Sequence, residues 1–199
     1  DQNLTSVRWE NDSLRIVPDT TSISVLSAGF NAGATCVISK NGINLLSNTF
    51  FAGMGIVVFD NITLAVDTST WFQLFNQPAN VEALATLIDS IPVGKIVAMG
   101  VADDARNNLS THLKNSIKSL GSNLIDSLQF RGSWALIGRK GAPSGSVQEM
   151  VKPSLPPESV FIDSNFVRLS DSGSFKTNPI GLAGSWKVIN VEENIPSDA

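Results

Sequence analysis

FRGSWALIGRKG, residues 130–141, is the stretch that decides the fold. Its middle, residues 133–138, is a short apolar run bounded by glycines, which favours a strand buried on both faces over a helix. We therefore expect a central strand of a β-sheet here. Cations lie at its two ends, Arg131 at one and Arg139 with Lys140 at the other. Two interpretations of them remain open: solvated strand ends, or contacts to a polar ligand at the rim of the sheet.

The length and composition predict one globular domain with decorations. The chain has 199 residues, of which 42% are hydrophobic and 16% charged, and this is enough to bury a full core. The formal net charge is −4, and Arg139–Lys140 is the only dense basic pair. Neutralising phosphates needs clustered Lys and Arg, so we expect no nucleic-acid partner.

The single cysteine and the hydropathy pattern further narrow the class of protein that this chain belongs to. Cys36 alone forms no internal disulfide and no metal–thiolate cluster, and its apolar surroundings predict a buried, inert thiol. No run approaches the roughly 18 apolar residues that span a bilayer, so no membrane insertion is expected. The chain starts at Asp1 without a methionine, which we interpret as a mature or excised fragment. Four Asn-X-Ser/Thr sequons hint at a secretory route: Asn3, Asn11, Asn61 and Asn108.

Short apolar or alternating runs predict strands along most of the chain. Residues 22–27 alternate with the period of a half-buried strand. Asn41-Gly42 separates two apolar runs and predicts a hairpin, because both residues accept the positive φ of a type I′ turn. The expected strands are residues 22–27, 35–39, 43–46, 56–59, 63–66, 95–101, 133–138, 160–169 and 186–191, after a peripheral strand or arm in residues 1–20. Residues 141–157 hold four prolines and are expected to form a surface loop.

Two segments change to the helical period. Residues 76–91 follow the i, i+3, i+4, i+7 rule, with Asn76 or Asn80 as candidate N-caps. A second helix is expected to begin after the N-cap Ser110 and to end at Gly121. Its buried stripe is predicted to be Leu113, Ile117 and Leu120. The order of these elements predicts a mixed sheet assembly with helices packed against it.

We find no catalytic constellation. The one histidine, His112, lies in the first turn of the second helix with no acid or nucleophile placed to work with it, and a Gly-x-Ser-x-Gly elbow is absent. Asp103 and Asp104 are neighbours that either hold a hard cation or form a solvated loop. Because further oxygen ligands at fixed spacing are not evident, the solvated loop is favoured. We expect no enzyme, no metal and no cofactor.

Three pieces in order resemble one family: GMGIVV at residues 53–58, SLGS at residues 119–122, and FRGSWALIGRKG at residues 130–141. Together they are similar to the interleukin-like EMT inducer family over residues 22–145. That family includes cytokine-like secreted proteins, a transferase stem domain that binds the sugar at the end of a glycan, and bacterial and phage-borne modules. The resemblance implies an α+β fold with two twisted, mostly antiparallel β-sheets packed with two main helices, and no known catalysis.

The resemblance also implies a sugar-contacting set. The family's aspartate matches Asp103 and its second arginine matches Arg131. Met54 stands where the family has its first arginine, and Gly132 where the motif has aspartate. We therefore take Asp103, Arg131, Met54 and the adjacent Asp104 as the candidate ligand-binding residues. A carboxylate and a guanidinium at one sheet edge either bond adjacent sugar hydroxyls or pair with each other, and both interpretations stay open.

The leading hypothesis is a non-enzymatic recognition module that binds a glycan or glycoprotein, on a secreted protein or a virion surface. The alternative is a structural, assembly or protein–protein interaction module of a larger phage or secreted protein, in which the face near Arg131 contacts another chain. The expected organisation is an N-terminal arm in residues 1–21, a core in residues 22–145, and a C-terminal loop with extra strands packed on the core in residues 146–199.

Overall fold

The computed structural model describes residues 3–5, 7–10, 13–16, 18–49, 51–106, 109–168 and 174–176. The chain divides into two units, one of residues 1–19 with 169–199 and one of residues 20–168. In the first unit β1 (Asn3–Thr5) pairs antiparallel with β13 (Ser174–Lys176), and β2 (Val7–Glu10) pairs antiparallel with β3 (Ser13–Ile16). The strand predicted at residues 186–191 lies outside the described residues.

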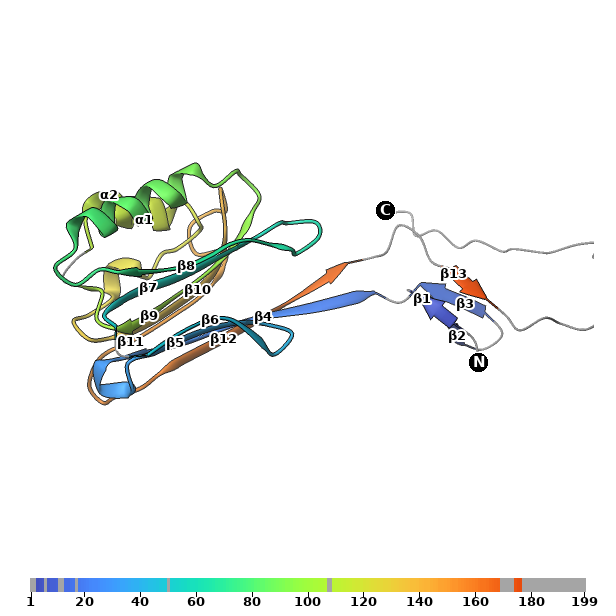
Figure 1. Cartoon of the computed structure of the whole chain (residues 1–199), viewed down its shortest axis with the longest axis horizontal. Coiled ribbons are helices and arrows are strands. Elements are labelled where there is room, and N and C mark those ends of the chain that lie inside the picture. Colours follow the sequence, from blue (N-terminus) through green and yellow to red (C-terminus); the bar gives the residue numbers. More distant parts are fainter. Residues whose placement is uncertain are drawn as a thin grey trace, which may run out of the picture. The chain divides into compact units, whose positions relative to one another are not determined.

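The second unit contains two β-layers, and both helices cover the same face of one of them (Figure 1). The helix-covered layer has the order β8 (Val66–Gln73), β7 (Gly53–Phe59), β9 (Ile96–Asp103), β10 (Ser133–Arg139), β11 (Gln148–Lys152), with every neighbouring pair antiparallel. The open layer has the order β6 (Ile43–Thr49), β5 (Thr35–Lys40), β4 (Asp19–Gly29), β12 (Val160–Arg168). The helices are α1 (Pro78–Ser90) and α2 (Thr111–Lys118), with short 3-10 helices η1 (Phe30–Ala32) and η3 (Ile125–Ser127).

A short parallel contact joins the two layers. Ala28 pairs with Ala102 and Gly29 with Asp103, so β4 and β9 connect all nine strands into one mixed sheet. The predicted α+β class with two main helices is confirmed. The two sheets expected from the sequence are thus two layers of one hydrogen-bonded sheet.

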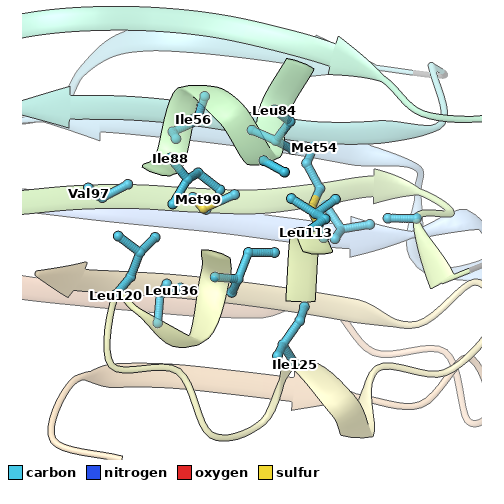
Figure 2. Packing of buried hydrophobic residues seen from close by; sticks show 14 of the residues in the cluster. Met54, Ile56, Leu84, Ile88, Val97, Met99, Leu113, Leu120, Ile125 and Leu136 are labelled. Atoms are coloured by element: carbon cyan, nitrogen blue, oxygen red, sulfur yellow. The ribbon is translucent and has the colours of Figure 1, made fainter. Parts of the chain in front are cut away.

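The three central strands of the helix-covered layer, β7, β9 and β10, are buried on both faces, as predicted for residues 133–138. Along β10, Trp134 and Leu136 face the helices, whereas Ala135 and Ile137 belong to the core between the two layers. Figure 2 shows Leu136 on the helix side of this layer, with Leu113 and Leu120 from α2 and the turn that follows it. Because its side chains alternate between the two faces of the layer, β10 contributes both to the core beneath the helices and to the core between the two layers.

The core between the layers depends on glycine at the closest approach. A Cβ atom added to Gly100 in β9 would lie 2.9 Å from both Cys36 Sγ and Val25 Cγ1 of the open layer. Cys36 is buried, as predicted, and burial raises the pKa of its thiol to about 12.

Local signals for turns and caps are mostly confirmed. Asn41 and Gly42 have φ of 50° and 75°, as a type I′ hairpin between β5 and β6 requires. Ser110 Oγ accepts from the Leu113 N–H at 3.1 Å, and Gly121 has φ of 94° after α2. The N-cap of α1 is Gln77, without a side-chain hydrogen bond, so the predicted asparagine caps are wrong.

Two strand predictions are also wrong. The strand expected at residues 63–66 is largely a turn, because Asp60 Oδ1 accepts from the N–H groups of Ile62 and Thr63 and closes it; β8 begins only at Val66. The loop expected at residues 141–157 contains β11, an edge strand that pairs with β10. Its residues are mostly polar, so no local pattern marks it, and only the partner strand makes it extended.

Candidate functional site

Three chain segments meet at one end of the sheet. They are the end of β4 with η1, the loop after β9, and the turn before β10. Gly29 pairs with Asp103, and its N–H donates to Ser133 Oγ at 2.9 Å. A Cβ atom at position 29 would lie 2.1 Å from the Arg131 carbonyl oxygen, so this crossing requires glycine. We call Phe30, Asp103, Asp104, Phe130 and Arg131 the Arg131 rim.

Arg131 presents a guanidinium that rests on aromatic faces. Its Cζ lies 4.0 Å from the centroid of the Phe30 ring and 5.0 Å from that of Phe130. Within the described part of the chain, no carboxylate oxygen lies within 4.0 Å of its nitrogens. Asp103 and Arg131 therefore do not form a direct ion pair. Cation–π contacts hold the planar group while they leave its N–H donors open for an acceptor.

Asp103 lies beside this cation. Its backbone has φ of 63°, a left-handed conformation that turns the chain out of β9. Burial and the neighbouring charge of Asp104 raise the pKa of its carboxyl, and the charge of Arg131 opposes them. A partly buried carboxylate beside an open guanidinium offers acceptors and donors at one edge, which suits adjacent sugar hydroxyls.

Asp104 is buried, with 4% of its surface exposed, so the prediction of a solvated loop is wrong for this residue. Its Oδ1 accepts from the N–H groups of Arg106 at 3.0 Å and Arg131 at 3.1 Å. Its Oδ2 is buried and has no hydrogen-bond partner among the described residues. Asp104 therefore ties the loop after β9 to the turn before β10 and positions Arg131. In the described ranges no three His, Cys, Asp or Glu side chains form a group that could hold a metal ion.

Met54 does not lie on the rim surface. Its side chain is fully buried in the core beneath the helices, beside Leu84 and Leu113 in Figure 2. A buried thioether has no exposed atom from which to contact a ligand. We therefore build the candidate site without Met54.

Sequence reasoning missed the two aromatic rings of the rim. Phe130 was within the quoted stretch, directly before Arg131, but Phe30 lies about a hundred positions away and no pattern connects them. A shallow depression of about 680 Å³ adjoins the rim. It is lined by Arg106, Asp126, Ser127, Leu128, Gln129 and Phe130.

Glu149 supports this end of the sheet from β11. One carboxylate oxygen accepts from Trp134 Nε1 at 2.7 Å and from Ser122 Oγ at 2.5 Å. The other accepts from the N–H groups of Asn123 and Leu124. These bonds anchor the segment that leads through η3 to Arg131.

His112 has acidic partners that the sequence did not reveal. Its Nδ1 lies 2.8 Å from Glu82 Oε2 and its Nε2 2.8 Å from Asp89 Oδ2, both from α1. The expectation that no acid is placed near it is wrong. Both ring nitrogens donate to carboxylates only when the ring is protonated, and this raises the pKa of His112. The arrangement is an ion-pair link between the two helices.

No helix among the described residues is long and apolar enough to cross a membrane.

Comparison with known proteins supports this description. A family model described as Interleukin-like EMT inducer matches residues 52–142. Cell surface hyaluronidase of Danio rerio is 32% identical over 112 residues, 56% of this chain and 8% of that protein. Cell migration-inducing and hyaluronan-binding protein of Mus musculus is 29% identical over 100 residues, 50% of this chain and 7% of that protein. Protein FAM3C of Xenopus laevis is 29% identical over 111 residues, 56% of this chain and 48% of that protein.

The chain therefore spans about half of FAM3C and less than a tenth of the other two relatives. The matched region contains β7, β8, α1, β9, α2 and β10, which together form most of the helix-covered layer. It also contains Asp103, Asp104, Phe130 and Arg131, four of the five residues of the rim. Residues 52–142 of the chain are therefore similar to the interleukin-like EMT inducer family, as the resemblance in the sequence predicts.

Proposed function

We propose that this domain is a non-enzymatic recognition module that binds a glycan at the Arg131 rim. The observation that carries the proposal is the Arg131 guanidinium, which lies on two phenylalanine rings with no acidic partner within 4.0 Å in the described part of the chain. A preorganised arginine of this kind binds a carboxylate or a pair of hydroxyl oxygens without first breaking an internal ion pair.

The neighbouring groups support a sugar as the ligand. Asp103 supplies acceptors for hydroxyl or amide donors beside the guanidinium, and the half-exposed rings of Phe30 and Phe130 supply apolar faces. The names of two relatives include hyaluronidase and hyaluronan-binding. We therefore take hyaluronan, an acidic polysaccharide, as the first probe, and we place the domain outside the cell.

The experiment is a binding titration of hyaluronan oligosaccharides against the wild type, Arg131→Ala and Arg139→Ala. Arg139 is exposed at the opposite end of β10, so its substitution makes the same charge change away from the rim. We expect Arg131→Ala to weaken binding at least tenfold, the loss of one to two charge-assisted hydrogen bonds, and Arg139→Ala to bind like the wild type. If Arg131→Ala and Arg139→Ala lose the same affinity, the loss is an effect of net charge and not of a site at Arg131. If the wild type binds neither hyaluronan nor any glycan of a glycan array, the proposal is refuted.

A second candidate function is assembly with another chain. In Figure 1, α1 and α2 lie on the helix-covered layer, and among the described residues no α-helix covers the outer face of the open layer. On β12, Phe161 is 57% exposed and Val167 66% exposed. Measuring the mass in solution of the wild type and of a Phe161→Ser, Val167→Ser double variant would test it. Self-assembly is supported if the wild type is an oligomer and the double variant is a monomer. A monomeric wild type opposes self-assembly.

A further inference from the structure

Two arginines, Arg106 and Arg131, are half-buried cations whose guanidinium groups have no hydrogen-bond acceptor and no acid within 4.0 Å in the described part of residues 20–168. Every lysine there differs, because its Nζ contacts a carboxylate or a backbone carbonyl at 3.4 Å or less. Arg139 also has no acid within 4.0 Å among these residues, but it is exposed. Taking a charge partly out of water costs free energy unless a partner compensates, so an acid from outside the chain would be stabilising at Arg106 and Arg131.

One buried carboxylate holds the backbones of these two arginines close together. Asp104 Oδ1 accepts from the N–H of Arg106 at 3.0 Å and from the N–H of Arg131 at 3.1 Å. Asp104 Oδ2 is buried and accepts from no group of the described residues, so neither oxygen bonds to a guanidinium. Asp104 therefore places Arg106 and Arg131 next to each other and leaves the donors of both side chains open.

Both arginines adjoin the shallow depression beside the rim. Arg106 and Phe130 line it, and the centroid of the Phe130 ring lies 5.0 Å from Arg131 Cζ. The acid in its lining is Asp126, whose two oxygens contact Lys114 Nζ at 3.4 Å and Lys118 Nζ at 2.5 Å. Because two lysines compensate the charge of Asp126, this carboxylate opposes an incoming anion only weakly.

Open guanidinium groups at one depression select a ligand that carries an acid. A guanidinium presents a planar fork of N–H donors, which matches the two oxygens of a carboxylate, and hydrogen bonds between two charged groups are about twice as strong as neutral ones. An anion in the depression is attracted by both Arg106 and Arg131, whereas a neutral hydroxyl gains little from the second cation. The arrangement therefore distinguishes acidic from neutral ligands.

We propose that Arg106 is a second ligand-contacting residue and that, with Arg131, it makes the site specific for glycans that carry a carboxylate. The carboxylate lies in the depression lined by Arg106 and Phe130, and the sugar that bears it contacts the Arg131 rim. This inference rests on the proposed glycan binding at Arg131, and it adds the class of glycan and the residue that selects it.

The test is a titration of hyaluronan oligosaccharides, which carry carboxylates, and of uncharged chito-oligosaccharides of the same lengths. The wild type should bind hyaluronan more tightly. Arg106→Gln should weaken hyaluronan binding roughly three- to tenfold and chito-oligosaccharide binding less than about twofold. Arg106→Lys keeps the charge without the planar fork and should regain part of the loss. Arg139→Gln, the same charge change at the opposite end of β10, should bind both series like the wild type.

The inference and the proposed function fail in different ways. If Arg106→Gln binds hyaluronan like the wild type while Arg131→Ala loses affinity, Arg106 is not a contact and the inference is wrong, but the proposed function stands. If Arg106→Gln weakens both series equally, Arg106 does not read the carboxylate and the inference is also wrong. If the wild type binds chito-oligosaccharides as tightly as hyaluronan, the acidic class is wrong. If the wild type binds neither series, the proposed function fails and the inference fails with it.

Discussion

The backbone N–H of Arg131 donates to Oδ1 of Asp104 at 3.1 Å, so a buried carboxylate on one loop positions the cation on the next. Both segments leave the sheet with left-handed backbone, Asp103 at φ of 63° and Arg131 at φ of 57°. Non-glycine residues adopt this conformation only where surrounding contacts compensate for it. The Asp104 carboxylate provides two such contacts, through the N–H groups of Arg131 and Arg106.

The first prediction concerns Asp104. Asp104→Ala leaves two partly buried N–H groups, those of Arg106 and Arg131, without their acceptor, so the free energy of unfolding should fall by about 1–3 kcal/mol. Asp104→Asn keeps an acceptor oxygen and should cost less. Urea unfolding checks both, with Asp163→Ala, an exposed aspartate on β12, as the control. If Asp104→Ala and Asp163→Ala have the same free energy of unfolding, the Asp104 carboxylate does not stabilise the rim.

The second prediction concerns the ring beneath Arg131. Phe30→Leu keeps an apolar side chain but removes the aromatic face 4.0 Å from the guanidinium. Affinity for hyaluronan oligosaccharides should fall roughly two- to fivefold, the contribution of an exposed cation–π contact. Phe30→Tyr keeps the face and should bind like the wild type. If the leucine variant matches the tyrosine variant, the ring does not orient the cation.

The third prediction is a pH dependence of stability through His112. Hydrogen bonds to Glu82 and then Asp89 raise its pKa above the ordinary value of 6.5. A group whose pKa is raised in the folded state stabilises fully below its unfolded pKa, and this contribution is lost as pH rises through the folded value. The melting temperature of the wild type should therefore fall as the pH rises above about 6.5, and that of His112→Gln should not show this fall.

The hydrogen bonds with His112 lower the pKa values of Glu82 and Asp89, so these two carboxylates change charge only at acidic pH. The melting temperatures of wild type and His112→Gln are therefore compared above about pH 6, where both carboxylates stay ionised. Thermal melts at low salt, monitored by circular dichroism, measure the difference. Parallel curves for wild type and His112→Gln across neutral and weakly alkaline pH would contradict the prediction.

The fourth prediction concerns the approach of the two layers at Gly100. Gly100→Ala places a methyl group against Cys36 Sγ and Val25 Cγ1, and overpacking of this kind costs about 1–3 kcal/mol of unfolding free energy. In the double variant Gly100→Ala, Cys36→Ala, the loss of unfolding free energy should be smaller than the sum of the losses in the two single variants, because the clashing sulfur atom is absent. Urea unfolding of the four chains completes this double-mutant cycle, and strict additivity would show that the thiol does not limit the approach.

Local sequence signals determined the parts of this fold that depend on neighbours in the chain. The apolar run of residues 133–138 became β10, buried on both faces, and Asn41-Gly42 became the hairpin turn between β5 and β6. Ser110 capped α2 as its hydroxyl predicts. These succeed because side-chain period, positive φ and capping act within a few residues.

Only the tertiary structure decided what lies between distant segments. β11 is extended because β10 offers it hydrogen bonds. Phe30 meets Arg131 because Gly29, at the end of β4, packs against the turn before β10 and donates to Ser133 Oγ. Met54 lies inside the helix-covered core, and Asp104 is buried under the rim. Contacts of this kind depend on how the layers pack, and no local pattern of residues encodes them. The charges at the ends of residues 130–141 were visible in the sequence; the rings that hold one of them in place were not.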